Sequence, residues 1–334
     1  MAKLPLTTLS IVIPVYSGEK YLASLIDQIA CLRDSLGVVG ISLCEVIAVV
    51  DDAKDDSLAV LQQLMQTYDF LRSITLASNV GQHQATSVGI LSAGSEWTIT
   101  MDEDLQHTPD LIPLMLYRAV EMSFDLVYCK SRSRVHRGLA YRDITSKISK
   151  SVISQLTNAD FTGVSSFRLI RSEIAKAAAI SMDSTLYLDS LLFRVTSEKR
   201  RLTIYKPMSD LRPNQSSYSI KRLVQHFVRF LTSSDVRFTK LTAALLGVTL
   251  TLIASFMLLI VYGYYDGVLE SQPGWTSTIL ATLFNITICT FGFLFTYKLL
   301  TILTGRSLRL PSFIVVDRKS DPEIAAALYQ YISS

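Results

Sequence analysis

The sequence predicts an α/β protein in which a mostly parallel sheet is followed by a membrane module. Short β-rich apolar runs alternate with stretches of helical periodicity in the first half of the 334-residue chain, which is typical of βαβ units. Polar residues follow several of these runs directly, at the positions where α/β sheets bind ligands. Two C-terminal runs, 241–265 and 271–297, contain no charged side chain, and each is long enough to cross a bilayer.

The elements of the α/β part follow from these patterns in chain order. Strands are expected at 9–15, 44–50, 73–77, 96–101 and 167–170. Helices are expected at 21–36, 58–68, 84–91 and 137–156. Such alternation places helices on both faces of the sheet.

Two aspartates follow the strand at 96–101, in the run Met101-Asp102-Glu103-Asp104. Alternate residues of an extended segment face the same way, so the carboxylates of Asp102 and Asp104 converge. Hard oxygen ligands suit Mg²⁺ or Mn²⁺, which usually keep water and bind substrate phosphates. An Asp-x-Asp pair alone is more often a solvated turn. Its place among other polar strand ends favours a metal site against a diphosphate.

A second acidic pair, Asp51-Asp52, follows the strand at 44–50. A carboxylate at this position can accept hydrogen bonds from ribose hydroxyls or from a uracil-type base. The alternative is a helix start, with an acidic or serine residue of 55–57 as its cap. The two roles are compatible.

The predicted organisation has six parts. They are an α/β domain at 1–218, an amphipathic helix at 219–240, a first span at 241–265, a loop at 266–275, a second span at 276–300 and a tail at 301–334. Basic residues between apolar residues at helical spacing suit a first helix that lies in the headgroup layer, with a solvated surface helix as the alternative. The alternative for the two spans is a pair of core helices, which seldom run uncharged for so long.

Charge placement predicts the orientation of the spans. Lysines and arginines flank the outer ends of the hairpin: Lys221, Arg222, Arg229, Arg237, Lys240, Lys298, Arg306 and Arg309. The loop between the spans carries Asp266 and Glu270 but no lysine or arginine. By the positive-inside rule, both ends of the hairpin are cytoplasmic.

Composition adds little beyond this. The net charge of +3 indicates nothing by itself, and no nucleic-acid partner is expected. We expect no signal peptide at the start of the chain, because the first residues are short of an apolar run and 9–15 reads as a strand. Its four cysteines show no metal-ligand spacing, so we expect reduced and mostly buried thiols.

Several motifs resemble those of family 2 glycosyltransferases of the polyprenyl-phosphate type, a group that includes the dolichol-phosphate mannose synthases and the bactoprenol glucosyltransferases. The matching segments are Ile13-Pro14-Val15-Tyr16 with Glu19, Val50-Asp51-Asp52 with Asp56, Asn79-Val80-Gly81-Gln82-His83 with Ala85, Met101-Asp102-Glu103-Asp104-Leu105-Gln106-His107 with Pro109, Ser166-Phe167-Arg168-Leu169 and Ser216-Ser217-Tyr218-Ser219. The run at 101–107 is the most specific, since it is close to the family's Met-Asp-Ala-Asp-Leu-Gln-His. The sequence departs from the family at Ala53-Lys54, where Gly-Ser is usual, and at Gln215, where Gly is usual.

This resemblance implies a Rossmann-like GT-A domain followed by an amphipathic interfacial helix and two transmembrane helices. It implies metal-dependent, inverting transfer of a sugar from a UDP- or GDP-linked nucleotide sugar to undecaprenyl or dolichyl phosphate. The product would serve glycan or lipid modification. The expected cofactor is Mg²⁺ or Mn²⁺, and the expected location is the bacterial inner membrane with the catalytic domain in the cytoplasm. A homo-oligomer is one option for the assembly.

The resemblance also implies roles for individual residues. The nucleotide sugar would contact Pro14, Tyr16, Glu19, Asp51, Asp52, Asn79, Gln82 and Asp102. Asp104 with Asp102 would hold the metal, and both would be catalytic together with Arg168. A lipid phosphate is largely ionised at neutral pH, so it needs cations more than a general base. The candidates at the acceptor phosphate are Arg132, Arg134, Arg168 and Ser217, with ordinary surface charge as the alternative for the arginines.

Two other hypotheses stay in view. One is a membrane-tethered transferase that acts on another lipid or on a glycan. The other is a catalytically silent membrane scaffold, against which the retained acidic pairs Asp51-Asp52 and Asp102/Asp104 argue. No Gln-x-x-Arg-Trp segment follows Asp189, which argues against a processive polysaccharide synthase.

Overall fold

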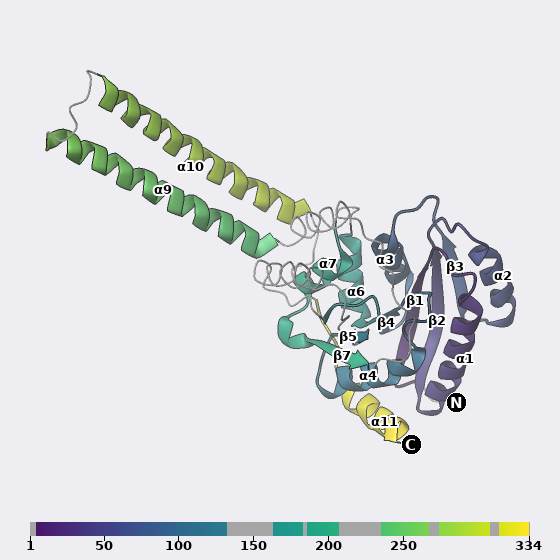
Figure 1. Ribbon diagram of the computed structural model, residues 1–334. Helices are drawn as coiled ribbons and strands as arrows, with labels where there is room; N and C mark the ends of the chain where they lie inside the picture. The colour runs from purple at the N-terminus through teal and green to yellow at the C-terminus, as the bar shows by residue number, and fades with distance from the viewer. Residues whose placement is uncertain are drawn as a thin grey trace, which may run out of the picture. The chain divides into compact units, whose positions relative to one another are not determined.

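The chain forms two compact units. The computed structural model describes residues 5–131, 163–182, 186–206, 235–266, 274–307 and 314–333. One unit contains a sheet, its helices and the segment 314–333, and the other contains two long helices, α9 (Asp235–Tyr265) and α10 (Trp275–Ser307) (Figure 1).

A seven-stranded mixed sheet organises the first unit. Its strands are β1 (Thr7–Val15), β2 (Ile41–Val50), β3 (Leu71–Thr75), β4 (Trp97–Thr100), β5 (Leu126–Ser131), β6 (Arg168–Arg171) and β7 (Arg201–Lys206). Their order in the sheet is β3-β2-β1-β4-β6-β5-β7. Strands β1 to β4 are mutually parallel, β5 and β7 are parallel to each other, and β6 is antiparallel to both β4 and β5. The predicted α/β class and mostly parallel sheet are therefore confirmed.

The five strands expected from the sequence are present as β1 to β4 and β6, with ends that shift by three residues or fewer. Two strands were missed. Strand β7 has a basic residue at each end and lies at the edge of the described sheet, so its sequence lacks the apolar run that marks the inner strands. Strand β5 follows a short turn after a helix that the sequence analysis also did not identify.

Helices flank the sheet and connect its strands (Figure 1). They are α1 (Leu22–Val38), α2 (Ser57–Thr67), α3 (Gln82–Ser92), the 3₁₀ turn η1 (Pro109–Leu111), α4 (Ile112–Glu121), α6 (Ser172–Ile180), α7 (Leu188–Val195), the 3₁₀ turn η3 (Glu198–Arg200) and α11 (Asp321–Ser333). Helix α1 buries residues at helical spacing, from Leu22 and Leu25 to Leu36, which is why its periodicity could be recognised.

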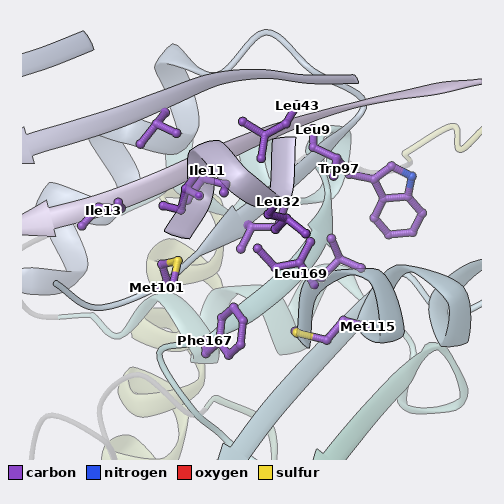
Figure 2. Packing of buried hydrophobic residues seen from close by; sticks show 14 of the residues in the cluster. Leu9, Ile11, Ile13, Leu32, Leu43, Trp97, Met101, Met115, Phe167 and Leu169 are labelled. Atoms are coloured by element: carbon purple, nitrogen blue, oxygen red, sulfur yellow. The ribbon is translucent and has the colours of Figure 1, made fainter. Parts of the chain in front are cut away.

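Alternation along β1 divides the core between the two faces of the sheet. Ile11 and Ile13 point into the larger cluster, which includes side chains of α1, α4 and α11 (Figure 2). Val12 points the other way, into a smaller cluster with Ala85 of α3. Because Ile11, Val12 and Ile13 are all fully buried, on one face or the other, β1 is an inner strand of the sheet.

Helices α9 and α10 pack along each other and expose apolar side chains over much of their length. Leu258 is 71 % exposed and Phe291 is 67 % exposed. Within the described residues, one helical stretch, Ser277–Tyr297, is both long and apolar enough to span a membrane, and Gly247–Gly263 is a shorter apolar stretch.

The segment 314–333 returns to the unit that contains the sheet. Helix α11 packs on α4 (Figure 1) and buries Ile324 and Leu328. Its first residue, Asp321, accepts two hydrogen bonds from Nη2 of Arg171 at the end of β6, at 2.5 and 2.6 Å. Arg318 pairs with the buried carboxylate of Asp125.

The free thiols differ from expectation. Cys129 is buried, but Cys31, Cys44 and Cys289 are exposed. The expectation of mostly buried thiols is wrong, because three of these residues lie on helix or strand faces that the core does not cover.

Candidate active site

The carboxyl ends of β1 to β4 lie at one edge of the sheet because these strands are parallel. The loops that follow them, together with the first residue of α3, carry most of the polar residues identified from the sequence, while Arg168 lies on β6. Hydrogen bonds join these loops in the structure, so the polar residues at the ends of β1 to β4 lie in one region rather than in separate turns.

The Asp102 carboxylate is held by side chains from two other parts of the sheet unit. Its Oδ1 accepts a hydrogen bond from Nε2 of Gln82, the first residue of α3, at 2.5 Å. Its Oδ2 accepts one from Oγ of Ser166 at 2.5 Å. Burial raises the pKa of Asp102, and the nearby negative charge of Asp104 raises it further, while the Ser166 hydrogen bond acts in the opposite direction. A cation beside the two carboxylates would relieve this penalty.

The sheet explains how Ser166 comes to face Asp102. Strands β4 and β6 pair antiparallel, with Thr100 opposite Arg168. Continuing that register by two residues on each strand brings Ser166 opposite Asp102. Ser166 lies within one of the family-like motifs, but no role for it could be predicted, because strand order cannot be read from a single sequence.

The donor set at Asp102 and Asp104 fits a hard divalent cation. Oδ1 of Asp104 accepts a hydrogen bond from the backbone N–H of Gln106 at 3.1 Å. No third carboxylate, histidine or cysteine completes a metal cluster among the residues that the structure describes. Two carboxylates suffice for Mg²⁺ or Mn²⁺, which usually take their other ligands from water and substrate phosphates.

Asp51 and Asp52 have different surroundings. Asp51 is buried, and its two carboxylate oxygens accept backbone hydrogen bonds from Val80 and Gly81 at 2.7 and 2.8 Å. Asn79 donates to the carbonyl oxygen of Asp51 at 3.1 Å. Asp51 therefore ties the end of β2 to the start of α3. Asp52 is exposed and has a φ of 53°, a left-handed conformation that Asp tolerates better than most residues.

Tyr16 presents an exposed ring at the end of β1. The ammonium group of Lys54 lies 5.6 Å from the ring centroid, and the backbone N–H of Lys54 donates to the carbonyl oxygen of Tyr16 at 3.3 Å. The interaction with Tyr16 raises the pKa of Lys54. Pro14 is half-buried in β1, and Glu19 is exposed beyond it.

Glu103 is a site residue that the sequence analysis missed. Its carboxylate accepts hydrogen bonds from the backbone N–H groups of Tyr16 and Ser17, at 3.1 and 2.9 Å. Burial raises the pKa of Glu103, against the effect of these two hydrogen bonds. The signal in the sequence is the departure of Glu103 from the family motif Met-Asp-Ala-Asp, which has alanine at this position.

Arg168 lies beneath the site and is buried. Its Nε and Nη2 donate to the two carboxylate oxygens of Asp189 at 2.8 and 2.9 Å. The hydroxyl of Tyr128 donates to the same carboxylate at 2.9 Å. Burial would raise the pKa of Asp189, but the charge and hydrogen bonds of Arg168 bring it below its ordinary value.

A second set of contacts connects Arg168 to the loop that contains Asp102 and Asp104. Its Nη1 donates to Oγ1 of Thr100 at 3.1 Å, and Thr100 in turn donates to the carbonyl oxygen of Ser166 at 2.7 Å. Ser166 holds Asp102, so Arg168 supports the aspartate through two intermediates. Its predicted contact with an acceptor phosphate stays a prediction. The other acceptor candidates, Arg132, Arg134 and Ser217, lie outside the described residues, as do the predicted helix at 137–156 and most of that at 219–240.

Two curated relatives carry the same printed name, undecaprenyl-phosphate 4-deoxy-4-formamido-L-arabinose transferase. The protein from Yersinia pestis (strain Pestoides F) is 26% identical over 290 residues, which cover 84% of this chain and 83% of the relative. The protein from Salmonella paratyphi A is 32% identical over 154 residues, which cover 46% of this chain and 45% of the relative.

Solved structures share the fold at low sequence identity. Mannosyl-3-phosphoglycerate synthase from Rubrobacter xylanophilus is 12% identical, with a TM-score of 0.52 over 80% of this chain and 78% of that one. Glucosyl-3-phosphoglycerate synthase from Mycobacterium tuberculosis, in complex with Mn²⁺ and UDP-glucose, is 15% identical, with a TM-score of 0.51 over 69% of this chain and 80% of that one. The α/β unit is therefore GT-A-like, as the sequence predicted.

The family comparison agrees with the fold and the site. The model of the family described as "Glycosyl transferase family 2" matches residues 10–178, about half of the chain. That segment contains most of β1, all of β2 to β6, and the loops that hold Tyr16, Asp51 and the Asp102/Asp104 pair. The chain belongs to glycosyl transferase family 2.

Proposed function

We propose that this protein transfers a sugar from a nucleotide sugar to a polyprenyl phosphate at the cytoplasmic face of a membrane, with inversion at the anomeric carbon. One observation carries the proposal. The carboxylate pair of a family 2 glycosyltransferase, with Asp102 held between Gln82 and Ser166, occurs in a chain that also contains long helices with exposed apolar faces.

The donor would lie over the carboxyl ends of β1 to β4. Tyr16 and Asp52 offer an exposed ring and an exposed carboxylate to the base and ribose, while Asp51 and Asn79 shape the loop behind them. Asp104, with Asp102, would hold a divalent metal, which offsets the charge that develops on the departing diphosphate. The Mycobacterium tuberculosis synthase of the same fold binds Mn²⁺ and UDP-glucose, which favours a uridine nucleotide and that ion.

The acceptor would be a lipid phosphate, as the name of the relatives in Yersinia and Salmonella suggests for those proteins. An oxygen of the phosphate attacks the anomeric carbon, the bond from that carbon to the diphosphate breaks, and the nucleoside diphosphate leaves. Because the second pKa of a phosphate monoester is about 6, the nucleophile is already ionised. Arg132 and Arg134 are proposed to offset its charge.

The path of the chain supports two membrane crossings. Residues before α9 and the segment 314–333 after α10 belong to one compact unit, which lies on one side of any membrane. A single crossing by α10 would place them on opposite sides. The chain must therefore cross an even number of times, so we propose that α9 crosses as well. Its apolar stretch Gly247–Gly263 is at the short end of the length range for a span.

The test is transfer by the purified full-length protein in detergent. It would be incubated with Mn²⁺, undecaprenyl phosphate and, in turn, several UDP- and GDP-linked sugars, and the lipid product would be detected by mass spectrometry. We expect one nucleotide sugar to give a lipid-phosphate sugar, and chelation to abolish the product. Transfer only to a lipid without phosphate, or only to a glycan, would contradict the proposal.

A further inference from the structure

Side chains from the segments that follow β2 and β4 accept hydrogen bonds from the backbone of the loop between β1 and α1. Four consecutive backbone N–H groups, those of residues 16–19, all donate to side-chain oxygens. Tyr16 and Ser17 donate to Glu103. Gly18 donates to Oγ of Ser57 at 2.9 Å, and Glu19 donates to Oδ2 of Asp55 at 3.1 Å.

These amides would otherwise attract an anion. Consecutive N–H groups just before a helix form a concave donor set, and the positive end of the helix dipole strengthens it. Here the protein supplies the anions itself, through Glu103 and Asp55. The diphosphate of the donor must therefore find its counter-charge elsewhere, which agrees with a metal at Asp102 and Asp104.

Glu103 differs from the other acceptors because of where it comes from. It lies between Asp102 and Asp104 in the loop after β4, whereas Asp55 lies in the loop after β2 and Ser57 is the first residue of α2. A shift of the Tyr16 backbone therefore acts through Glu103 on the loop of the proposed metal ligands. The family motif for this loop has alanine at the position of Glu103. A family member with alanine there would lack this connection.

The Glu103 carboxylate occupies the space next to Gly18 where a larger residue would place its Cβ atom. A Cβ atom at position 18 would lie 2.4 Å from Oε2 of Glu103 and 3.0 Å from Cγ of Leu22. The φ of Gly18 does not lie in the left-handed region. Alanine is therefore disfavoured at position 18 by space and not by backbone conformation, and the nearest obstacle is the Glu103 carboxylate.

We propose that Glu103 is a positioning residue that connects the loop after β1, which contains Tyr16, to the loop after β4, which contains Asp102 and Asp104. Through this connection, nucleotide sugar and divalent metal bind cooperatively. The inference rests on the proposed function. Glu103 would contact neither ligand. It would fix the distance between the place where the base binds and the carboxylates that hold the metal. Binding of one ligand would therefore order the loop that binds the other ligand.

The first test reads the connection itself and needs no substrate. Amide hydrogen exchange of the full-length protein in detergent would be compared for wild type, Glu103→Ala, Glu103→Gln and the control Glu121→Gln. Glu121 is an acidic residue on α4 whose carboxylate contacts Tyr117 and Arg118. We expect exchange at Tyr16 and Ser17 to rise about tenfold in Glu103→Ala, less in Glu103→Gln, and not in the control. Unchanged exchange at these amides in Glu103→Ala would overturn the proposal.

The second test measures coupling. The affinity for the preferred nucleotide sugar would be determined by calorimetry with and without Mn²⁺. In wild type we expect Mn²⁺ to tighten donor binding, and in Glu103→Ala we expect that gain to fall about fivefold or more. Steady-state kinetics should show KM for the donor raised about tenfold in Glu103→Ala, with kcat changed by less than about threefold.

A double-mutant cycle separates a positioning role from general damage. Gly18→Ala alone should raise the donor KM, because its Cβ displaces the Glu103 carboxylate. In the Glu103→Ala background the same change should cost much less, so the effects are not additive. Additive effects of Gly18→Ala and Glu103→Ala on the donor KM would overturn the positioning role of Glu103. An undiminished effect of Mn²⁺ on donor binding in Glu103→Ala would do the same. Neither result would contradict the proposed function. A wild-type protein that binds no nucleotide sugar would overturn the coupling together with the proposed function.

Discussion

Arg168 and Asp189 form a two-pronged ion pair beneath the active-site loops, with an Nε–Oδ1 distance of 2.8 Å and an Nη2–Oδ2 distance of 2.9 Å. Both side chains are less than one tenth exposed. Removing one partner of such a pair leaves an uncompensated buried charge. Any experiment on Arg168 therefore measures this pair first.

Arg168→Ala should lower the free energy of unfolding by about 3–5 kcal/mol. The measurement is denaturant unfolding in detergent, followed by circular dichroism. Asp189→Asn is the matched variant, because it breaks the pair but keeps the guanidinium. If Arg168 binds the acceptor directly, Arg168→Ala should raise KM for the lipid phosphate more than the donor KM, and Asp189→Asn should not. If the two variants change the KM for the lipid phosphate equally, Arg168 does not bind the acceptor directly, and its role is to support the loop that contains Asp102.

The same pair predicts how stability depends on pH. The pKa of Asp189 is lowered from its ordinary value of 3.8, so the native state favours the ionised carboxylate. The resulting stabilisation is fully present above pH 3.8 and is lost as the pH falls through the lowered value. The stability difference between wild type and Asp189→Asn should be constant from neutral pH down to about pH 5 and shrink at lower pH. A difference that grows on acidification would contradict this assignment.

Asp104→Asn should abolish sugar transfer while expression and membrane insertion stay normal. The substitution keeps the shape of the side chain but removes a charge that a hard divalent cation requires. We expect a loss of about 100-fold or more in kcat, measured with saturating Mn²⁺. Asp110→Asn, on the exposed 3₁₀ turn after this loop, is the control for a neighbouring charge. Wild-type turnover in the Asp104 variant would remove Asp104 from the metal site.

Asp321→Asn should loosen the return of the chain onto the sheet unit. Asp321 is buried and accepts two hydrogen bonds from Arg171, and Arg171 also stacks over the buried ring of Trp97 at 4.3 Å. We expect a loss of about 3 kcal/mol in the free energy of unfolding and faster proteolysis of α11. Lys319→Ala changes an exposed charge two residues away and should have no effect on either readout.

The topology predicts which positions an impermeant thiol reagent reaches on intact cells. Single cysteines at Ser271 and Ser334 would be introduced in a background without the four native cysteines. We expect labelling at Ser271, between the two proposed spans, and protection at Ser334. The physical reason is the excess of lysine and arginine outside the hairpin and their absence from its short loop. Labelling at Ser334 but not at Ser271 would show that the orientation is the opposite of the predicted one. It would also contradict the proposal that the donor comes from the cytosol.

Sequence patterns predicted which polar residues gather at one edge of the sheet better than they predicted the contacts that hold those residues in place. The polar ends of β1 to β4 could be identified because apolar runs stop abruptly at Tyr16, Asp51 and Asp102, and parallel strands collect their ends at one edge. Asp51 was expected to contact the nucleotide, yet both of its carboxylate oxygens accept backbone hydrogen bonds. Hydrogen bonds of this kind leave no pattern in a single chain.

The roles of Ser166 and Asp189 could not be predicted for a related reason. The contact of Ser166 with Asp102 depends on the antiparallel pairing of β6 with β4, and the contact of Asp189 depends on how α7 packs beside β6. The paired segments are far apart in the sequence, and the antiparallel β6 is an exception within a mostly parallel sheet. Helix α11 was missed as well, because nothing in a tail beyond two apolar runs indicates that it packs against α4.

The return of α11 sets an order on the biosynthesis of this enzyme. Arg171 and Asp125 emerge from the ribosome before α9 and α10, but their partners Asp321 and Arg318 emerge after both. A nascent chain therefore lacks the ion pairs of Arg171 with Asp321 and of Asp125 with Arg318, and it has an uncovered apolar face on α4, until both long helices have been made. If these helices enter the bilayer as proposed, the catalytic unit is completed only after insertion. A chain that fails to insert would display an incomplete fold to the proteases of the cytosol.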